Sequence, residues 1–191
     1  MKESIVITGS GIVSSIGLDK QETLSSLLAG KSGVSPVRYL KTAHREFPVG
    51  EVPLSDEEMK SRLGIHAEPT TRTVLMGMLA LDEAIGEACL LGSDGRRAIL
   101  VSGTTVGGMD KSEQFFSDYL QNDSRNDYIK IHDCGTTTDM IASRFGIFSM
   151  ATTVSTACSS AANALILGAN LIRRALSMAR KAPSPSSLEA V

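Results

Sequence analysis

The sequence of 191 residues contains no tryptophan, and aromatic residues make up only 4% of it. We therefore expect a core of aliphatic side chains and methionine, of which there are eight. Cysteine is also scarce, since Cys89, Cys134 and Cys158 lie far apart and without CxxC spacing. An odd, scattered set in a chain without a secretory signal argues against a disulfide framework and indicates reduced thiols.

Long apolar runs and a strong excess of one charge are missing as well. No stretch approaches the roughly 20 apolar residues that span a bilayer, and the first apolar run is too short for a signal peptide. The formal net charge is -2, so bulk charge favours neither nucleic acid nor an anionic membrane. We expect a cytoplasmic globular protein with no membrane and no nucleic-acid partner.

The sequence also lacks the usual patterns of metal and cofactor sites. His44, His66 and His132 are scattered among polar residues, whereas a metal site needs converging ligands. The glycine-rich run 9–17 follows an apolar segment, but Ser14 stands where a dinucleotide-binding loop has its third glycine. We therefore predict no cofactor and no metal.

The sequence does contain an alternation of strand-like and helix-like segments. Strands are expected at residues 4–8, 97–103 and 151–156, and helices at 71–91, 110–120, 136–145 and 159–179. Residues 31–69 hold four of the six prolines and predict a long loop with minor elements. This order predicts an α/β layer with a mainly parallel sheet and flanking helices. The loops at the carboxyl ends of the strands, 9–17, 103–108 and 156–159, are the candidates for function.

Local signals indicate further details of the helices. The pair Asp110 and Glu113 is typical of a capping box, and Gly92 is expected to end the helix predicted over 71–91. On that helix, Asp82, Glu83 and Glu87 fit a charged solvent face better than paired acid–base groups.

Cys158 is the candidate catalytic residue. The strand-like run 151–156 leads into it and the helix-like run 159–179 follows it, so the thiol is expected at a helix N-terminus. Unpaired N–H groups and the helix dipole favour a thiolate there. The small residues around it leave room for a reactant, but they equally fit a small buried cysteine. Cys89 and Cys134 are predicted to be structural or incidental.

The segment around Cys158 resembles the active-site segment of the β-ketoacyl synthases, the condensing enzymes of fatty-acid and polyketide synthesis. Residues 156–160 are Thr-Ala-Cys-Ser-Ser, and alanines follow at 161, 162 and 164. Four more segments resemble the family in the same order: 6–17 (Val-Ile-Thr-Gly-Ser-Gly-Ile-Val-Ser-Ser-Ile-Gly), 28–34 (Leu-Ala-Gly-Lys-Ser-Gly-Val), 101–109 (Val-Ser-Gly-Thr-Thr-Val-Gly-Gly-Met) and 141–146 (Ile-Ala-Ser-Arg-Phe-Gly). The resemblance covers about residues 4–175, and only the segment around Cys158 indicates chemistry.

The resemblance implies a thiolase-like fold, of which this chain would be the N-terminal half. It implies that Cys158 accepts an acyl group from an acyl carrier protein thioester. The carbanion left when malonyl-carrier protein loses carbon dioxide would then attack the acyl-enzyme. Acyl carrier protein is thus the implied partner, and full-length members of the family are expected to be homodimers.

The sequence departs from the family after the nucleophile segment. The family uses two histidines, and usually a lysine, from the second half of its fold, whereas no histidine follows His132 here. We expect an incomplete family domain at residues 1–176 and a disordered or aberrant tail at 177–191, where prolines and serines cluster. Truncation is hypothesised, with a shifted reading frame as one explanation, and this chain alone is not expected to complete condensation.

Two other functions stay open at this point. A non-catalytic partner subunit of a condensing enzyme would keep the fold but typically lose the nucleophile, so the presence of Cys158 argues against it. An unrelated cysteine hydrolase with a strand–turn–helix elbow would need a histidine base, and none stands in a recognisable position. A half-fold would also expose the apolar surface against which its other half packs, so self-association is expected.

Overall fold

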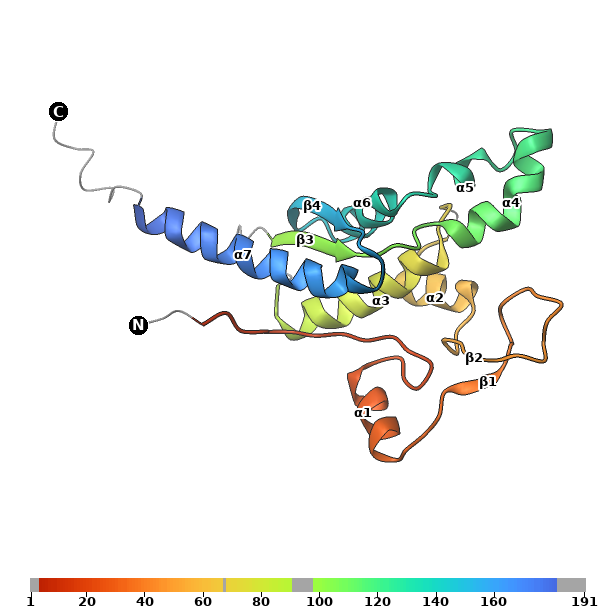
Figure 1. Cartoon of the computed structure of the whole chain (residues 1–191), viewed down its shortest axis with the longest axis horizontal. Helices are drawn as coiled ribbons and strands as arrows, with labels where there is room; N and C mark the ends of the chain where they lie inside the picture. Colours follow the sequence, from red (N-terminus) through yellow and green to blue (C-terminus); the bar gives the residue numbers. More distant parts are fainter. Residues whose placement is uncertain (1–3, 67, 91–97, 182–191) are drawn as a thin grey trace.

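The computed structural model describes residues 4–66, 68–90 and 98–181, with side chains described up to residue 176 (Figure 1). The elements in chain order are α1 (Lys20–Leu28), β1 (Val34–Pro36), β2 (Pro48–Gly50), α2 (Asp56–Leu63), α3 (Arg72–Glu87), β3 (Ala98–Gly103), α4 (Met109–Gln121), α5 (Asn126–Lys130), α6 (Cys134–Phe145), β4 (Phe148–Val154), a short 3-10 turn (Ala157–Ser159) and α7 (Ser160–Lys181). No helix among these residues is long and apolar enough to cross a membrane.

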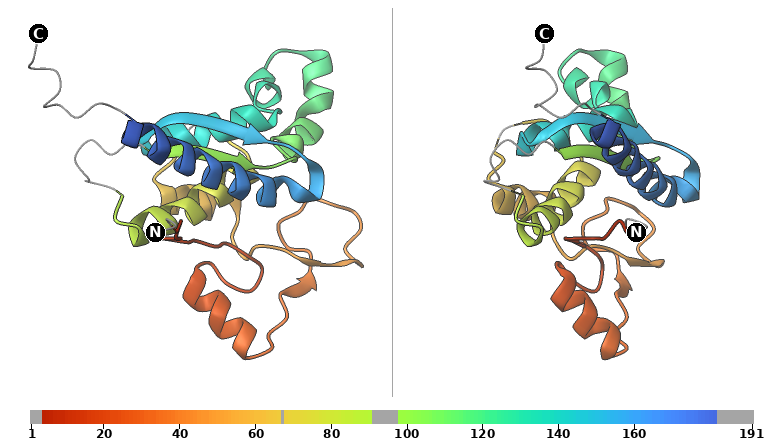
Figure 2. Two further views of the ribbon diagram at one scale, coloured as in Figure 1. Left: turned by 60° about the vertical axis from the view of Figure 1, so that its left-hand side comes forward. Right: turned by 90° about the vertical axis from the view of Figure 1, so that its left-hand side faces the viewer.

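The strands β3 and β4 form a parallel sheet with helices on both faces. Gly103 pairs with Val154 at its carboxyl end, and a bulge interrupts the register near Ala98. The helix α7 lies along one face and α6 packs on the other (Figures 1 and 2). The hydroxyls of Thr138 on α6 and Thr153 on β4 share a hydrogen bond of 2.6 Å. A parallel sheet with flanking helices confirms the predicted α/β class.

The hydrophobic core lies mainly between α2, α3 and α6. Met59, Val74 and Leu75 have no exposed surface, and Met78 and Ile141 join the same cluster. Burying each such side chain stabilises the fold by about 1.5–3 kcal/mol. The core is therefore aliphatic with methionine, as the scarcity of aromatic residues predicts.

Residues 4–8 do not form the buried strand that the sequence predicts. Val6 is 70% exposed and Ile7 84%, and neither sheet among the described residues includes them. An apolar run becomes a buried strand only where another strand pairs with its backbone, and nothing local supplies that partner. The chain then runs along α3, so closely that a Cβ on Gly11 would lie 1.9 Å from the Ala80 carbonyl oxygen.

Two glutamates of α3, Glu83 and Glu87, hold the glycine-rich loop 9–17, a role that the expected solvent face did not include, although Glu87 remains exposed. The carboxylate of Glu83 accepts the backbone N–H groups of Ile12 and Lys20, each at 3.0 Å. That of Glu87 accepts the N–H of Ser10 at 2.7 Å and pairs with the ammonium of Lys20. The hydrogen bond from Lys20, followed by that from Ser10, holds the pKa of Glu87 below its ordinary value.

The end of α3 and the start of α4 also differ from the predictions. The last helical residue of α3 is Glu87, and Cys89 follows with a left-handed φ of 52° where glycine is usual. Gly92 lies outside the described residues. At α4 the N-cap is Gly108 without a side-chain cap, so the capping box predicted from Asp110 and Glu113 is wrong. Asp110 instead accepts the N–H at the start of α3, 3.3 Å away.

Residues 31–69 are mainly loop, as predicted, but they contain the β1–β2 hairpin and α2. The capping box that begins α2 is not among the predicted features. Ser55 Oγ accepts the Glu58 N–H at 3.1 Å, and the Glu58 carboxylate accepts the Ser55 N–H at 2.7 Å. The polar connection after α4 likewise contains α5.

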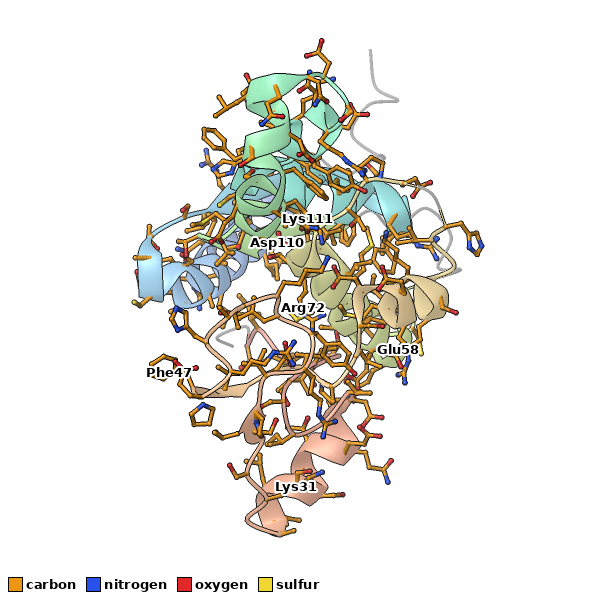
Figure 3. The ribbon with its side chains drawn as sticks, turned by 90° about the vertical axis from the view of Figure 1, so that its right-hand side faces the viewer. Lys31, Phe47, Glu58, Arg72, Asp110 and Lys111 are labelled. Carbon is orange, nitrogen blue, oxygen red and sulfur yellow. The ribbon has the colours of Figure 1, made fainter. Side chains whose placement is uncertain are left out.

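A cluster of charged side chains ties α2, α3 and α4 together at their N-termini. Asp56 on α2 accepts a hydrogen bond of 3.0 Å from Arg72 on α3 and one of 2.9 Å from Lys111 on α4. Asp110 lies 3.7 Å from the ammonium of Lys111. Figure 3 shows Arg72, Asp110 and Lys111 together between these helices. Through Asp56, the cluster connects the segment 31–69 to the helices α3 and α4, which precede and follow β3.

Candidate active site at the cysteine turn

Cys158 lies on the turn between β4 and α7, as the sequence predicts. The strand ends at Val154, and a 3-10 turn over Ala157–Ser159 leads directly into α7. The thiol is exposed to solvent. The alternative of a small buried cysteine is therefore wrong, and the sulfur is open to a reactant.

The backbone just before Cys158 adopts a conformation that few residues with a Cβ adopt. Ala157 has a φ of 52°, in the left-handed region. Such a residue persists only where its surroundings hold it in place. Ser160, which is only 4% exposed, does so from the first turn of α7. Its hydroxyl donates to the Ala157 carbonyl at 2.8 Å and accepts the Thr156 N–H at 2.9 Å.

A second group of hydrogen bonds joins the two ends of the turn. The hydroxyl of Ser159 donates to the Thr156 carbonyl at 2.7 Å. The side-chain amide of Asn163 donates to Thr156 Oγ1 at 2.9 Å and to Ser159 Oγ at 3.3 Å. Ala157 and Cys158 thus lie between Thr156 and Ser159, which are hydrogen-bonded to each other and to Asn163.

The loop after β3 lies against this turn. A Cβ on Gly103 would lie 2.7 Å from both the carbonyl carbon and the carbonyl oxygen of Ser160, so only glycine allows α7 to begin so close to the strand. The N–H of Thr104 continues the sheet by donating to the Val154 carbonyl at 3.2 Å. The predicted loop 103–108 therefore begins beside the strand end and the helix start that flank the predicted loop 156–159.

The third predicted loop, 9–17, makes its hydrogen bonds elsewhere in the described structure. It is fixed to α3 by Glu83 and Glu87. The structure therefore places the loops after β3 and β4 at the same end of the sheet, and it attaches the loop 9–17 to the helix that precedes β3.

Among the described residues, no histidine side chain is hydrogen-bonded to the turn that carries the thiol. His132 Nδ1 lies 2.8 Å from Ser112 Oγ on α4, and His44 Nδ1 lies 3.1 Å from the Glu46 carboxylate. His66 is exposed on the loop after α2. In the ranges that the structure describes, no group of three or more metal-ligating side chains is found.

The peptide before Cys158 is oriented for interaction with an approaching group. The Ala157 carbonyl points to Ser160, so the N–H of Cys158, on the opposite side of the same trans peptide, points away from it. Among the described residues, neither this N–H nor Sγ of Cys158 has a hydrogen-bond partner. A thiol and an N–H donor from one residue are therefore both available to the same approaching group.

Sequence reasoning found Cys158 but missed the residues that hold it. Ser160 and Asn163 belong to a run of small residues, which was interpreted only as room for a reactant. One signal was available, because Asn163 is a polar residue one turn into a helix start that is otherwise rich in alanine. The positive φ of Ala157 could not be predicted, because alanine does not favour the left-handed region.

Comparisons with known proteins identify the family of the chain. The family model "Beta-ketoacyl synthase, N-terminal domain" matches residues 2–179. The 3-oxoacyl-[acyl-carrier-protein] synthase 1 of Haemophilus influenzae is 46% identical over 54 residues, which are 28% of this chain and 13% of that protein.

Two solved structures have a similar fold. "The ishigamide ketosynthase/chain length factor" is 26% identical with a TM-score of 0.65, and the match covers 79% of this chain and 39% of that one. A β-ketoacyl synthase from Burkholderia phymatum STM815 is 20% identical with a TM-score of 0.63, covering 88% and 43%. This chain therefore spans less than half the length of each relative.

Proposed function

Because the chain belongs to the β-ketoacyl synthase family through its N-terminal domain, we propose that Cys158 is the nucleophile that accepts an acyl group from an acyl carrier protein thioester. One observation carries the proposal. The thiol is exposed at the start of α7, on a turn whose left-handed Ala157 is held by the buried Ser160.

The acylation step follows from this geometry. The Cys158 thiolate attacks the carbonyl carbon of the acyl thioester, and the N–H of Cys158 stabilises the oxyanion that forms. The bond between the carbonyl carbon and the carrier sulfur then breaks. The acyl group stays on Sγ of Cys158 as a new thioester, and the carrier leaves as a thiolate that takes a proton from water.

Condensation would require further groups. In that step the carbanion formed when a malonyl thioester loses carbon dioxide attacks the acyl-Cys158 thioester, which gives a β-ketoacyl product and frees the thiol. Within the described residues, His132 is hydrogen-bonded to Ser112 and His44 to Glu46, and neither bond involves the cysteine turn. We therefore expect this chain, acting alone, to stop at the acyl-enzyme.

The extent of the domain and its partners belong to the same proposal. Residues 1–176 would form the family domain, with 177–191 as a separate tail; α7 continues across that boundary to Lys181, and residues 182–191 lie outside the described part. Acyl carrier protein would be the acyl donor, and a homodimer the assembly of the full-length protein.

Intact-mass spectrometry tests the acylation directly. The chain is mixed with octanoyl-acyl carrier protein, and a mass increase of one octanoyl group is expected, located on Cys158 by peptide mapping. Cys158→Ala abolishes the adduct, whereas Cys89→Ala and Cys134→Ala, as matched controls, retain it. No adduct, or one that survives Cys158→Ala, would overturn the proposal. A β-ketoacyl product after addition of malonyl-carrier protein would contradict the expected stop at the acyl-enzyme.

A further inference from the structure

Asn163 occupies a special place in α7, one helical turn after Ser159. We infer that Asn163 is a positioning residue, whose side chain fixes the turn so that Sγ and the N–H of Cys158 face the same reacting carbonyl. This inference rests on the proposed function of Cys158, because it assigns a role to Asn163 in acyl transfer to that thiol.

The contacts of Asn163 span the segment that carries the thiol. Its amide nitrogen donates to Thr156 Oγ1, before the cysteine, and to Ser159 Oγ, after it. Side chains on a helix lean toward its N-terminus, so a residue four positions after Ser159 reaches back over the turn. The amide group suits this place because one NH2 group can donate to two hydroxyl oxygens.

The hydroxyl of Ser159 is itself fixed, since it donates to the Thr156 carbonyl at 2.7 Å. Asn163 therefore closes a small network in which both flanking residues of the Ala157–Cys158 pair are bonded to each other and to α7. Without the amide, Thr156 keeps its backbone bond to Ser160 and the 3.1 Å hydrogen bond that its Oγ1 accepts from Ser159 Oγ. The turn then loses the side-chain restraint that comes from Asn163 and keeps those from Ser159 and Ser160.

The consequence concerns alignment more than stability. Attack on a thioester needs the sulfur and the N–H donor at defined positions around one carbonyl group, and small displacements slow such reactions strongly. Alkylation of the same thiol by iodoacetamide needs only access to the sulfur. A loss of alignment therefore slows acyl transfer while leaving alkylation nearly unchanged.

The test compares these two reactions in the full chain with Cys89→Ser and Cys134→Ser, so that Cys158 is the only thiol. With octanoyl-N-acetylcysteamine as acyl donor, Asn163→Ala is expected to slow acylation of Cys158 about tenfold, the rate equivalent of one or two net hydrogen bonds. Alkylation by iodoacetamide should change less than about twofold, since access to the sulfur is unaltered. Asn170→Ala is the matched control, because Asn170 lies exposed on the same helix and its side-chain oxygen accepts a hydrogen bond from its neighbour Arg173.

Thr156→Val removes the hydrogen bond with Asn163 from the other side, together with the one from Ser159 Oγ to Thr156 Oγ1, with little change of shape. It should slow acylation at least as much as Asn163→Ala does, and the double variant should be no slower than Thr156→Val, because both substitutions break the same network. Thermal unfolding shows whether each variant is folded. If Asn163→Ala does not fold, the acylation rate of Thr156→Val alone tests the network.

Each outcome has a defined meaning. Acylation of Asn163→Ala at the parent rate, additive losses in the double variant, or equal losses of acylation and alkylation would each overturn the role of Asn163 while the proposed function stands. Absence of acylation in the parent chain would overturn the proposed function itself, and the inference with it.

Discussion

Ser160 is the residue whose contacts most directly set the backbone at Cys158. It is nearly fully buried, and its hydroxyl bonds both the Thr156 N–H and the Ala157 carbonyl. Removing the hydroxyl leaves both backbone groups with fewer partners, while the left-handed Ala157 keeps its strain.

Ser160→Ala is therefore expected to lower the free energy of unfolding by about 1–2 kcal/mol and to slow acylation of Cys158 as well. Urea unfolding and the octanoyl mass assay measure the two effects. Ser155→Ala is the control, since Ser155 is exposed on the same turn, and its free energy should change by less than about 0.5 kcal/mol. Equal stability of Ser160→Ala and the parent would show that the hydroxyl does not hold the turn.

At the scale of elements, the sequence predicts best where the signal is local. The strand–turn–helix around Cys158 and the strand that ends at Gly103 follow from apolar runs and small residues, and the structure confirms both. Predictions fail where a distant partner decides. The hydrogen bonds of Glu83 and Glu87 to the loop 9–17 could not be predicted from their helix alone, and Asp110 accepts the N–H at the start of α3 where a capping box was expected. The residues around the thiol were missed for the same reason, because their roles depend on a backbone conformation.

The charged cluster at the N-termini of α2, α3 and α4 belongs to this class of long-range contacts. Burial by itself raises the pKa of Asp56, but the hydrogen bonds and charges of Lys111 and then Arg72 outweigh it and lower that pKa below its ordinary value of 3.8. For Lys111, burial by itself lowers the pKa. The hydrogen bond and charge of Asp56, followed by the charge of Asp110, outweigh burial and raise that pKa above 10.5.

The sign of the pH dependence follows from these directions. The contribution of Asp56 to stability is complete above its unfolded pKa of 3.8 and is lost as pH falls through the lower folded pKa. The contribution of Lys111 is complete below 10.5 and is lost as pH rises through the higher folded pKa. The cluster thus stabilises the protein between these two limits.

Asp56→Asn should lower the free energy of unfolding at neutral pH by about 2 kcal/mol, less than the about 3–5 kcal/mol of a fully buried pair because Asp56 is partly exposed. Chemical unfolding at a series of pH values should show the difference from the parent shrinking as pH falls below 4. Glu57→Gln, at an exposed position on the same helix, should leave the profile unchanged. A pH-independent difference would mean that the loss comes from packing and not from the charge.

At the scale of the whole molecule, the largest unexplained feature is its exposed apolar surface. On α7 it comprises Leu165, Ile166, Ile172 and Leu176, and Leu165 is 72% exposed. A groove of about 450 Å³ between α7 and β3 has mainly apolar walls, including Ile99, Leu171 and Ile172. Contiguous apolar surface of this kind marks an interaction site or a tendency to associate. The expectation of an exposed apolar face therefore agrees with the structure.

The chain should consequently self-associate as its concentration rises, because burying α7 against a second copy removes this surface from water. Sedimentation velocity over a concentration series measures the association. The double variant Leu165→Gln/Ile166→Gln keeps helix-forming residues at both positions and should shift the distribution towards monomer. Leu120→Gln is the matched control, since Leu120 is 68% exposed on α4, and it should leave the distribution unchanged. If the parent chain sediments as a single monomer at every concentration, or if both variants act alike, the apolar face of α7 is not the surface through which copies associate.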